Sequence, residues 1–152
     1  CDAGLIDFEK CHWGDSKVTN SVFVVGDSMS WAIADSVIDS TINEGLGIQA
    51  LVSNGCSITE SKILTNDPCG VWRAKILSIL LEKNPEMVII ANSIGYSEQD
   101  LLGMGRLINT LNSKKIKVIF ILAEWECSKV GNLVCRYLSS IFRSMLYSIV
   151  ID

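Results

Sequence analysis

The sequence predicts an α/β fold: a doubly wound, mainly parallel, five-stranded sheet in three layers, with helices on both faces. Two observations predict this class. Short continuous apolar runs alternate along the chain with segments of helical periodicity. The apolar runs lack polar alternation, which is typical of parallel strands that are covered on both faces. Because crossovers between parallel strands are right-handed, these units wind into a layered sheet.

The strands and helices are expected in alternation after a polar, irregular segment at residues 1–20. The strands are expected at 22–25, 48–52, 87–91, 117–122 and 148–151. The helices are expected at 30–43, 71–82, 98–112 and 133–146, and a loop is expected at 53–68. Gly45 and Gly47 close the first helix, and Asn84-Pro85 stops the second.

The inward faces of the first two helices are predicted from their apolar spacing. In the first helix the expected inward residues are Trp31, Ala34, Val37, Ile38 and Ile42. In the second helix they are Val71, Trp72, Ile76, Ile79 and Leu80. Both tryptophans are therefore expected in the core, whereas Trp13 and Trp125 are expected in loops, where they could stack on a sugar.

Length and composition predict a single domain and exclude some partners. A chain of 152 residues, 49% of them hydrophobic, buries about two-thirds of its unfolded surface. The net charge is −4 and no basic stripe is present, so no nucleic-acid partner is expected. The longest apolar run, 118–123, is too short to span a bilayer. Because the chain begins at Cys1, we expect a mature or excised piece from which any signal has been removed.

Six cysteines indicate an oxidising compartment, and they fall into three local pairs. The pairs expected as disulfides are Cys1 with Cys11, Cys56 with Cys69, and Cys127 with Cys135. Six cysteines allow about 15 connectivities, so other pairings, free thiols and a lipidated Cys1 remain alternatives. No Cys-x-x-Cys motif occurs and the chain has one histidine, so we expect no metal and no cofactor.

A serine follows the first expected strand at a sharp break. The run 22–25 ends at Gly26-Asp27-Ser28-Met29, where a helix begins. Free N–H groups and the positive end of the helix dipole at that point can stabilise an oxyanion beside the Ser28 hydroxyl. In a doubly wound sheet, ligands bind beyond the carboxyl ends of the strands. Four loops are expected to meet there, at 26–30, 53–59, 92–97 and 123–127.

The order of these motifs resembles one protein family. Cys-His-Trp-Gly-Asp at 11–15 is followed by Val-Phe-Val-Val-Gly-Asp-Ser at 22–28, Asn-Gly-Cys-Ser at 54–57, Cys69 and the strand 87–91, then the Cys127 and Cys135 pair. This order resembles the SGNH (GDSL-type) hydrolases. Within them it is similar to the extracytoplasmic SGNH domain fused to membrane acyltransferases of the acyltransferase-three family, which O-acylate surface polysaccharides. The resemblance covers most of the chain and implies the SGNH form of the flavodoxin-like fold.

The resemblance also implies roles for individual residues. Ser28 would be the nucleophile and its own N–H one oxyanion donor, while Asp27 would brace the turn. The Gly55 N–H would be the second donor. Asn92 would be the third oxyanion ligand, although the usual Gly-x-Asn-Asp pattern is absent, and capping of a loop is the alternative role for Asn92.

The sequence departs from the family pattern in its acid–base residues. Met29 stands where members of this subgroup often have histidine, and no Asp-x-x-His occurs in the chain. A serine needs a base beside it, and His12 lies upstream of Ser28, where we expect a surface loop rather than the base. We therefore expect the catalytic segment to lie beyond Asp152, in which case residues 1–152 alone would be inactive. The alternative is that the base has been lost.

The function implied by the resemblance is serine-dependent O-acyl transfer, with acetyl the expected group, to a cell-surface polysaccharide, or ester hydrolysis on it. A membrane acyltransferase domain, expected in the same polypeptide, would relay the acyl donor. The expected location is the bacterial periplasm, with the full-length protein tethered to the membrane. The alternatives are a non-catalytic glycan-binding or scaffold domain and an anion-binding domain that uses the same helix N-terminus.

Overall fold

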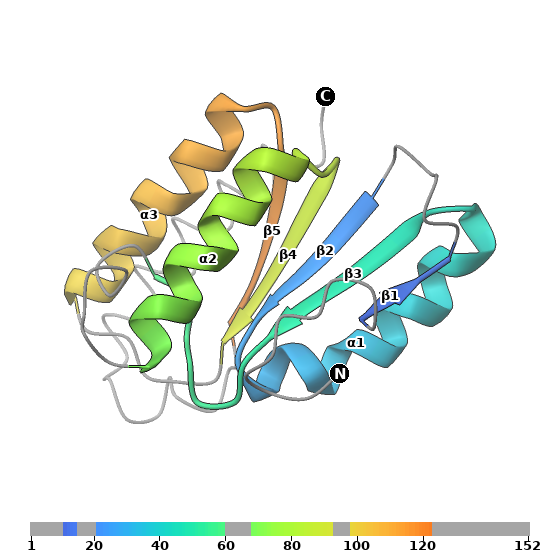
Figure 1. Cartoon of the computed structure of the whole chain (residues 1–152), viewed down its shortest axis with the longest axis horizontal. Helices are drawn as coiled ribbons and strands as arrows, with labels where there is room; N and C mark the ends of the chain where they lie inside the picture. The colour runs from blue at the N-terminus through green and yellow to red at the C-terminus, as the bar shows by residue number, and fades with distance from the viewer. Residues whose placement is uncertain (1–10, 15–20, 60–67, 93–97, 123–152) are drawn as a thin grey trace.

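A computed structural model describes residues 11–14, 21–59, 68–92 and 98–122 of the chain. These residues form five strands, three α-helices and one 3₁₀ turn (Figure 1). The strands are β1 (His12–Trp13), β2 (Ser21–Gly26), β3 (Gly47–Val52), β4 (Met87–Asn92) and β5 (Lys117–Leu122). The helices are α1 (Ser28–Thr41), α2 (Pro68–Lys83) and α3 (Glu98–Ser113), and the 3₁₀ turn η1 spans Ile42–Glu44.

The strands lie in one sheet in the order β1-β3-β2-β4-β5. β2, β3, β4 and β5 are parallel, and β1 runs antiparallel to β3. This arrangement confirms the predicted α/β class. The chain passes from β2 to β3 on one side and then crosses to β4 on the other side of β2. The strand order therefore reverses at β2, and ligand sites in such sheets lie at the carboxyl ends of the strands beside this reversal.

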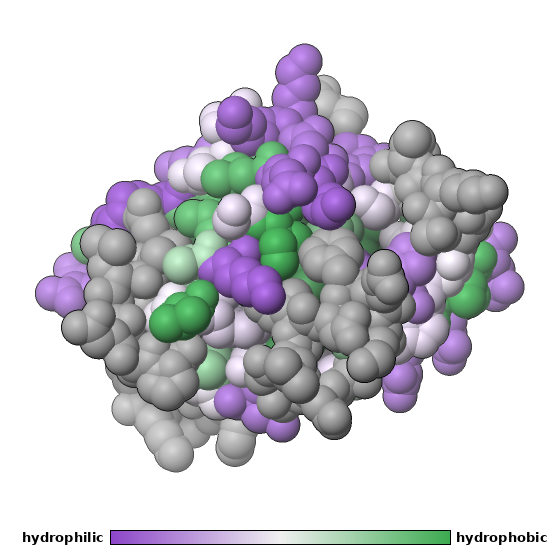
Figure 2. Space-filling model, viewed as in Figure 1, coloured by the Kyte–Doolittle hydropathy of each residue, from purple (hydrophilic) through white to green (hydrophobic). Residues whose placement is uncertain are grey.

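The helices divide between the two faces of the sheet. α2 and α3 lie together on the face nearest the viewer in Figure 1, and α1 packs against β2, β3 and β4 from the other side. Figure 2 shows the face with α2 and α3, where hydrophilic residues gather along the upper rim and hydrophobic residues form smaller areas between them. No helix within the described ranges has both the length and the apolarity needed to cross a bilayer.

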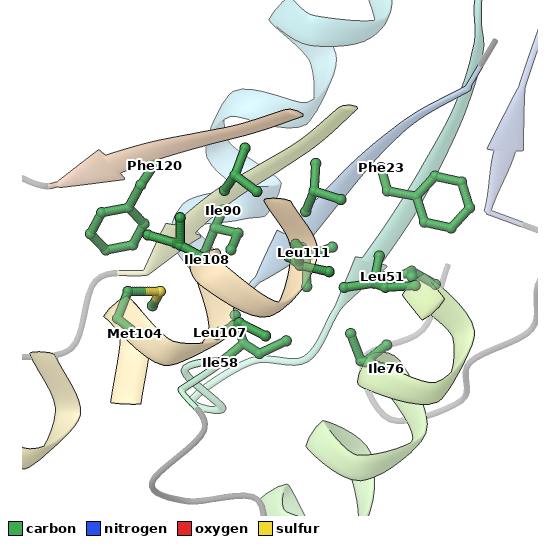
Figure 3. Packing of buried hydrophobic residues seen from close by; sticks show 14 of the residues in the cluster. Phe23, Leu51, Ile58, Ile76, Ile90, Met104, Leu107, Ile108, Leu111 and Phe120 are labelled. Carbon is green, nitrogen blue, oxygen red and sulfur yellow. The ribbon is translucent and has the colours of Figure 1, made fainter. Parts of the chain in front are cut away.

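The main core lies between the sheet and the helices α2 and α3. Phe23, Leu51, Ile90 and Phe120 project from the strands toward the two helices (Figure 3). The two helices contribute large apolar side chains that are almost fully buried: Ile76, Leu80, Met104, Leu107, Ile108 and Leu111. Each such side chain contributes roughly 1.5–3 kcal/mol when it leaves water. The continuous apolar strands of the sequence thus form the middle layer, as predicted.

Two of the expected inward residues face solvent instead. Val71 is 73% exposed, because α2 starts at Pro68 and turns Trp72, Ile76 and Leu80 toward the core. Ile42 is 41% exposed, because α1 ends at Thr41 and Ile42 belongs to η1. Trp72 is buried as predicted, whereas Trp31 is only half-buried.

The segment expected to be irregular contains a strand. His12 and Trp13 form β1, whose residues lie opposite Gln49 and Ile48 of β3, so Trp13 is in a strand rather than a loop. Gly47, expected to end a helix, begins β3, and α1 begins at Ser28 rather than at residue 30. Cys69 follows the expected loop at 53–68 and lies in the first turn of α2, which starts at Pro68 rather than at residue 71. The helix expected at 133–146 and the strand expected at 148–151 lie outside the described residues.

Candidate active site

The turn after β2 depends on Gly26. This residue has a φ of +144°, a conformation that favours glycine. A Cβ atom at this position would lie 2.1 Å from the Ala91 carbonyl oxygen and 2.7 Å from Asn92 Oδ1. The backbone of β2 therefore approaches the end of β4 more closely than any side chain would allow.

Asp27 caps α1 and leads into Ser28. Its buried carboxylate accepts a hydrogen bond from the Met29 N–H at 2.9 Å, and its carbonyl oxygen accepts one from the Ser30 N–H at 2.9 Å. Ser28, the first residue of α1, is exposed. No described residue hydrogen bonds to its hydroxyl. The Ser28 hydroxyl thus stands at the positive end of the helix dipole with its oxygen available to a ligand.

Ser30 fastens the first turn of α1 to the sheet. Its buried Oγ lies 2.8 Å from the Val25 carbonyl oxygen and 2.7 Å from the Ala91 carbonyl oxygen. A hydroxyl has one proton, so the two carbonyl groups share the donor. Through this contact the end of β2, the end of β4 and the start of α1 are joined at the point where the strand order reverses.

The loop after β3 begins beside the serine turn. Val52 lies level with Gly26 across the parallel pair, and the Ser53 N–H donates to the Gly26 carbonyl at 3.0 Å. The Cys56 N–H then donates to the Ser53 carbonyl at 3.0 Å, which closes a four-residue turn. Gly55 is the third residue of this turn, with a φ of +75°, and it is exposed. The candidate donor Gly55 therefore lies in a turn that directly follows β3, the strand next to β2.

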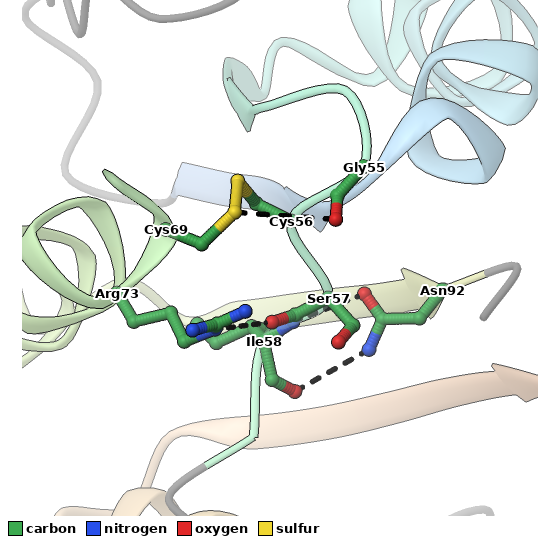
Figure 4. Close-up of a disulfide and its surroundings, with 7 residues drawn as sticks. All are labelled: Gly55, Cys56, Ser57, Ile58, Cys69, Arg73 and Asn92. Carbon is green, nitrogen blue, oxygen red and sulfur yellow. Dashed lines mark hydrogen bonds between the residues drawn. A yellow bond between two sulfur atoms is a disulfide. The ribbon is translucent and has the colours of Figure 1, made fainter. Parts of the chain in front are cut away.

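The residues that follow Gly55 are attached to α2 and β4 (Figure 4). Cys56 forms a disulfide with Cys69 of α2, with a Cα–Cα distance of 5.3 Å. Arg73 of α2 donates through Nε to the Ser57 carbonyl at 2.6 Å. Further along the loop, buried Thr59 lies within 3.5 Å of Asp100 Oδ1 on α3.

Asn92 ends β4 and is buried. Its Oδ1 accepts from the Ile58 N–H, and its Nδ2 donates to the Ile58 carbonyl, both at 3.3 Å. These two bonds match the alternative role of a loop-capping asparagine. The amide group has a second N–H beyond the one that Ile58 uses, so the role of Asn92 as an oxyanion ligand stays a prediction.

The structure brings some of the expected site residues together and separates His12 from them. Ser28, the Gly55 turn and Asn92 all follow the carboxyl ends of the adjacent strands β2, β3 and β4. His12 lies in β1, the end strand of the sheet that the described residues form, opposite Gln49 and separated from β2 by β3. It is half-buried rather than in a surface loop, and its buried Nε2 has no hydrogen-bond partner among the described residues. The expected loops at 93–97 and 123–127 lie outside the described residues.

The described residues contain one complete disulfide, at an expected pair, and one cysteine of a second disulfide. Cys56–Cys69 is present, and Cys11 is disulfide-bonded to a residue outside the described ranges. The cysteines Cys1, Cys127 and Cys135 lie outside these ranges as well.

Sequence reasoning missed two residues that shape the site. Ser30 gave no signal apart from following the serine turn. Arg73 looks in the sequence like any charged residue on an amphipathic helix. Only its position four residues after Cys69, and so on the same side of α2, hints that both face the same loop.

The fold and the site together define a class: doubly wound α/β proteins with an exposed serine at the start of the first crossover helix. A family model described as "SGNH domain (fused to AT3 domains)" matches residues 1–133. The chain belongs to this family, which confirms the resemblance predicted from the motifs.

A solved structure supports the same fold. The periplasmic domain of a lipopolysaccharide acetyltransferase from Salmonella ser. Paratyphi A superposes with a TM-score of 0.53 at 15% sequence identity. The match covers 66% of this chain and 43% of that one, so the present chain corresponds to less than half of its length. No curated protein matches the sequence.

Proposed function

We propose that this domain transfers an acyl group, acetyl being the expected one, through Ser28 to a hydroxyl of a cell-surface polysaccharide, or hydrolyses such an ester. The observation that carries the proposal is the exposed Ser28 hydroxyl, which stands at the N-terminus of α1 and hydrogen bonds to no described residue. Membership of a family of SGNH domains fused to AT3 domains supports the same chemistry.

The reaction begins with attack by Ser28 Oγ on the carbonyl carbon of the acyl donor. The hydroxyl proton passes to a general base, and a tetrahedral oxyanion forms. When this intermediate collapses, the leaving group departs with a proton and the acyl group remains esterified to Ser28. A sugar hydroxyl then attacks the ester and restores Ser28, which completes transfer, whereas water in the same place completes hydrolysis.

The oxyanion is stabilised by N–H groups at the carboxyl edge of the sheet. We assign the backbone N–H groups of Ser28 and Gly55 as donors, with the second amide N–H of Asn92 as the third ligand. Two observations support this assignment: the Gly55 turn follows the strand next to β2, and a Cβ atom at Gly26 would lie 2.7 Å from Asn92 Oδ1. Removing one donor of this kind typically lowers kcat by roughly 10²–10³-fold.

The partners follow from the family to which the chain belongs. The acyl donor is relayed by a membrane acyltransferase domain of the same polypeptide, and the acceptor is a surface glycan. The reaction takes place in the bacterial periplasm, where the disulfide between Cys56 and Cys69 is stable.

The test is covalent labelling of the protein at its natural full length. A fluorophosphonate probe and an activated acetyl ester are each added to the wild type, Ser28→Ala and Ser36→Ala, and intact mass is measured. Ser36 is exposed on the same helix and serves as the control. We expect one adduct per chain on the wild type and on Ser36→Ala, and none on Ser28→Ala. An adduct that persists on Ser28→Ala would contradict the assignment, and a wild type that stays unlabelled would favour a non-catalytic glycan-binding domain.

A further inference from the structure

Three consecutive residues after Gly55 are each attached to a different point of the fold. Cys56 is bonded to Cys69 of α2, the Ser57 carbonyl accepts from Arg73 Nε at 2.6 Å, and the Ile58 backbone pairs with Asn92 (Figure 4). These attachments hold residues that are themselves buried, namely Cys56, Ser57 and Ile58. Their concentration next to Gly55 indicates that the position of this turn matters.

Arg73 is the one of these attachments that is made by a buried charged side chain. The residue is only 3% exposed, although an arginine is rarely buried to this extent. Its Nε is directed at a main-chain carbonyl, and a hydrogen bond from a charged donor is stronger and shorter than a neutral one. Cys69 and Arg73 are four residues apart on α2, so the same side of the helix holds Cys56 and Ser57.

Gly55 is exposed, and no heavy atom of a described residue lies within 4 Å of the position that a Cβ atom would occupy. Its carbonyl oxygen lies 4.0 Å from Cys69 Sγ (Figure 4). The Gly55 peptide is therefore held by the disulfide and by the residues next to it in the chain. Whatever fixes Ser57 also limits how far the Gly55 peptide can rotate.

We propose that Arg73 is a positioning residue for acyl transfer, which holds the Gly55 N–H in the place where it meets the oxyanion. This inference rests on the proposed function. The N–H acts on a charge that is present in the transition state and not in the bound ester. Loss of Arg73 therefore lowers kcat and leaves KM nearly unchanged.

The experiment compares Arg73→Gln, Arg73→Lys and Lys75→Gln in the protein at its natural full length. Lys75 is exposed on the same helix and controls for loss of a positive charge. Hydrolysis of 4-nitrophenyl acetate gives kcat and KM, and hydrogen–deuterium exchange reports on the loop at 53–58. We expect R73Q to lower kcat at least about tenfold with KM within about twofold. We expect faster exchange at 53–58 in R73Q, partial recovery of kcat in R73K and no change in K75Q.

The outcomes separate the inference from the function on which it rests. If R73Q matches the wild type in both kcat and loop exchange, Arg73 does not position the turn. If exchange rises but kcat stays constant, the turn does not carry a donor and the inference is wrong. If R73Q does not fold, the same two measurements, kcat and exchange at 53–58, are made on R73K and read by the same criteria. Turnover that survives Ser28→Ala overturns the proposed function itself, and with it any catalytic effect of Arg73, whatever the exchange data.

Discussion

Gly26 is the residue on which the geometry of the serine turn most directly depends. A methyl group there would lie 2.1 Å from the Ala91 carbonyl oxygen and 2.6 Å from Ser30 Oγ, and the φ of +144° disfavours any side chain. Strain and overpacking each cost about 1–3 kcal/mol. We therefore expect Gly26→Ala to lower the free energy of unfolding by about 3 kcal/mol or more, as measured by urea denaturation.

Gly105→Ala is the matched control for this prediction. Gly105 lies inside α3, and no heavy atom of a described residue outside this helix's own backbone is within 4 Å of the place its Cβ would take. Alanine restricts the unfolded chain more than glycine does, so this change is expected to stabilise the protein by about 0.5–1 kcal/mol. Equal effects of the two substitutions would show that close contact at Gly26 is not what the turn requires.

Ser30 also stabilises the serine turn, through hydrogen bonds to the ends of β2 and β4. Ser30→Ala removes the donor shared by the Val25 and Ala91 carbonyl groups, and we expect a loss of about 1–3 kcal/mol in the free energy of unfolding. Ser40→Ala on the same helix removes an exposed bond to the Val37 carbonyl and should change stability by less than about 0.5 kcal/mol. If thermal melting shifts equally for both variants, the buried contact does not fasten α1 to the sheet.

The residues of the site differ in how far the sequence could predict them. Ser28 was identifiable because an apolar strand, a glycine and a capping aspartate precede it, and each has a local physical reason. Arg73 is not identifiable from the sequence, because the residue that it contacts, Ser57, precedes it by 16 positions and lies in the loop before α2. Asn92 hydrogen bonds to Ile58, which is 34 residues away in the sequence, and no local sequence pattern identifies this partner.

Among the elements, the Cys56–Cys69 disulfide joins the loop after β3 to the first turn of α2. It closes a loop with a sequence separation of 13, and a loop of this length is expected to stabilise the fold by about 3 kcal/mol. We expect the double variant Cys56→Ala, Cys69→Ala to lose this amount in urea unfolding, with native circular dichroism retained. A loss below about 1 kcal/mol would mean that the contacts of Arg73 and Asn92 already restrain the loop.

The sequence predicts the elements that have a clear hydrophobic pattern, and it does not predict the start of α2 or the short strand β1. The parallel strands follow from continuous apolar runs. The start of α2 was placed too late, because a proline in a presumed loop also suits the first turn of a helix. β1 was missed because two residues carry no periodicity, and only pairing with β3 makes them a strand.

For the molecule as a whole, the alternation of strands and helices is enough to predict the layers and the edge of the sheet at which the candidate site residues lie. Parallel register places Gly26 level with Val52 and Ala91, so the turns that follow these strands start side by side. This convergence needs no contact between particular side chains. The contacts that hold Gly55 and Asn92, the candidate donors, depend on how the helices pack against the sheet, which a single sequence does not reveal.

The same architecture predicts how protection from hydrogen exchange is distributed over the molecule. β2 is paired on both sides and its interior is buried, whereas β1 is a two-residue strand that, among the described strands, is paired only with β3. Amides at 22–25 should exchange only through global unfolding, and amides at 12–13 should exchange through local opening, at least about 100-fold faster. Mass spectrometry of peptic fragments, with the disulfides kept intact during labelling, measures both. If 12–13 were protected as strongly as 22–25, β1 would belong to the cooperative core, and the outer edge of the sheet would lie beyond it.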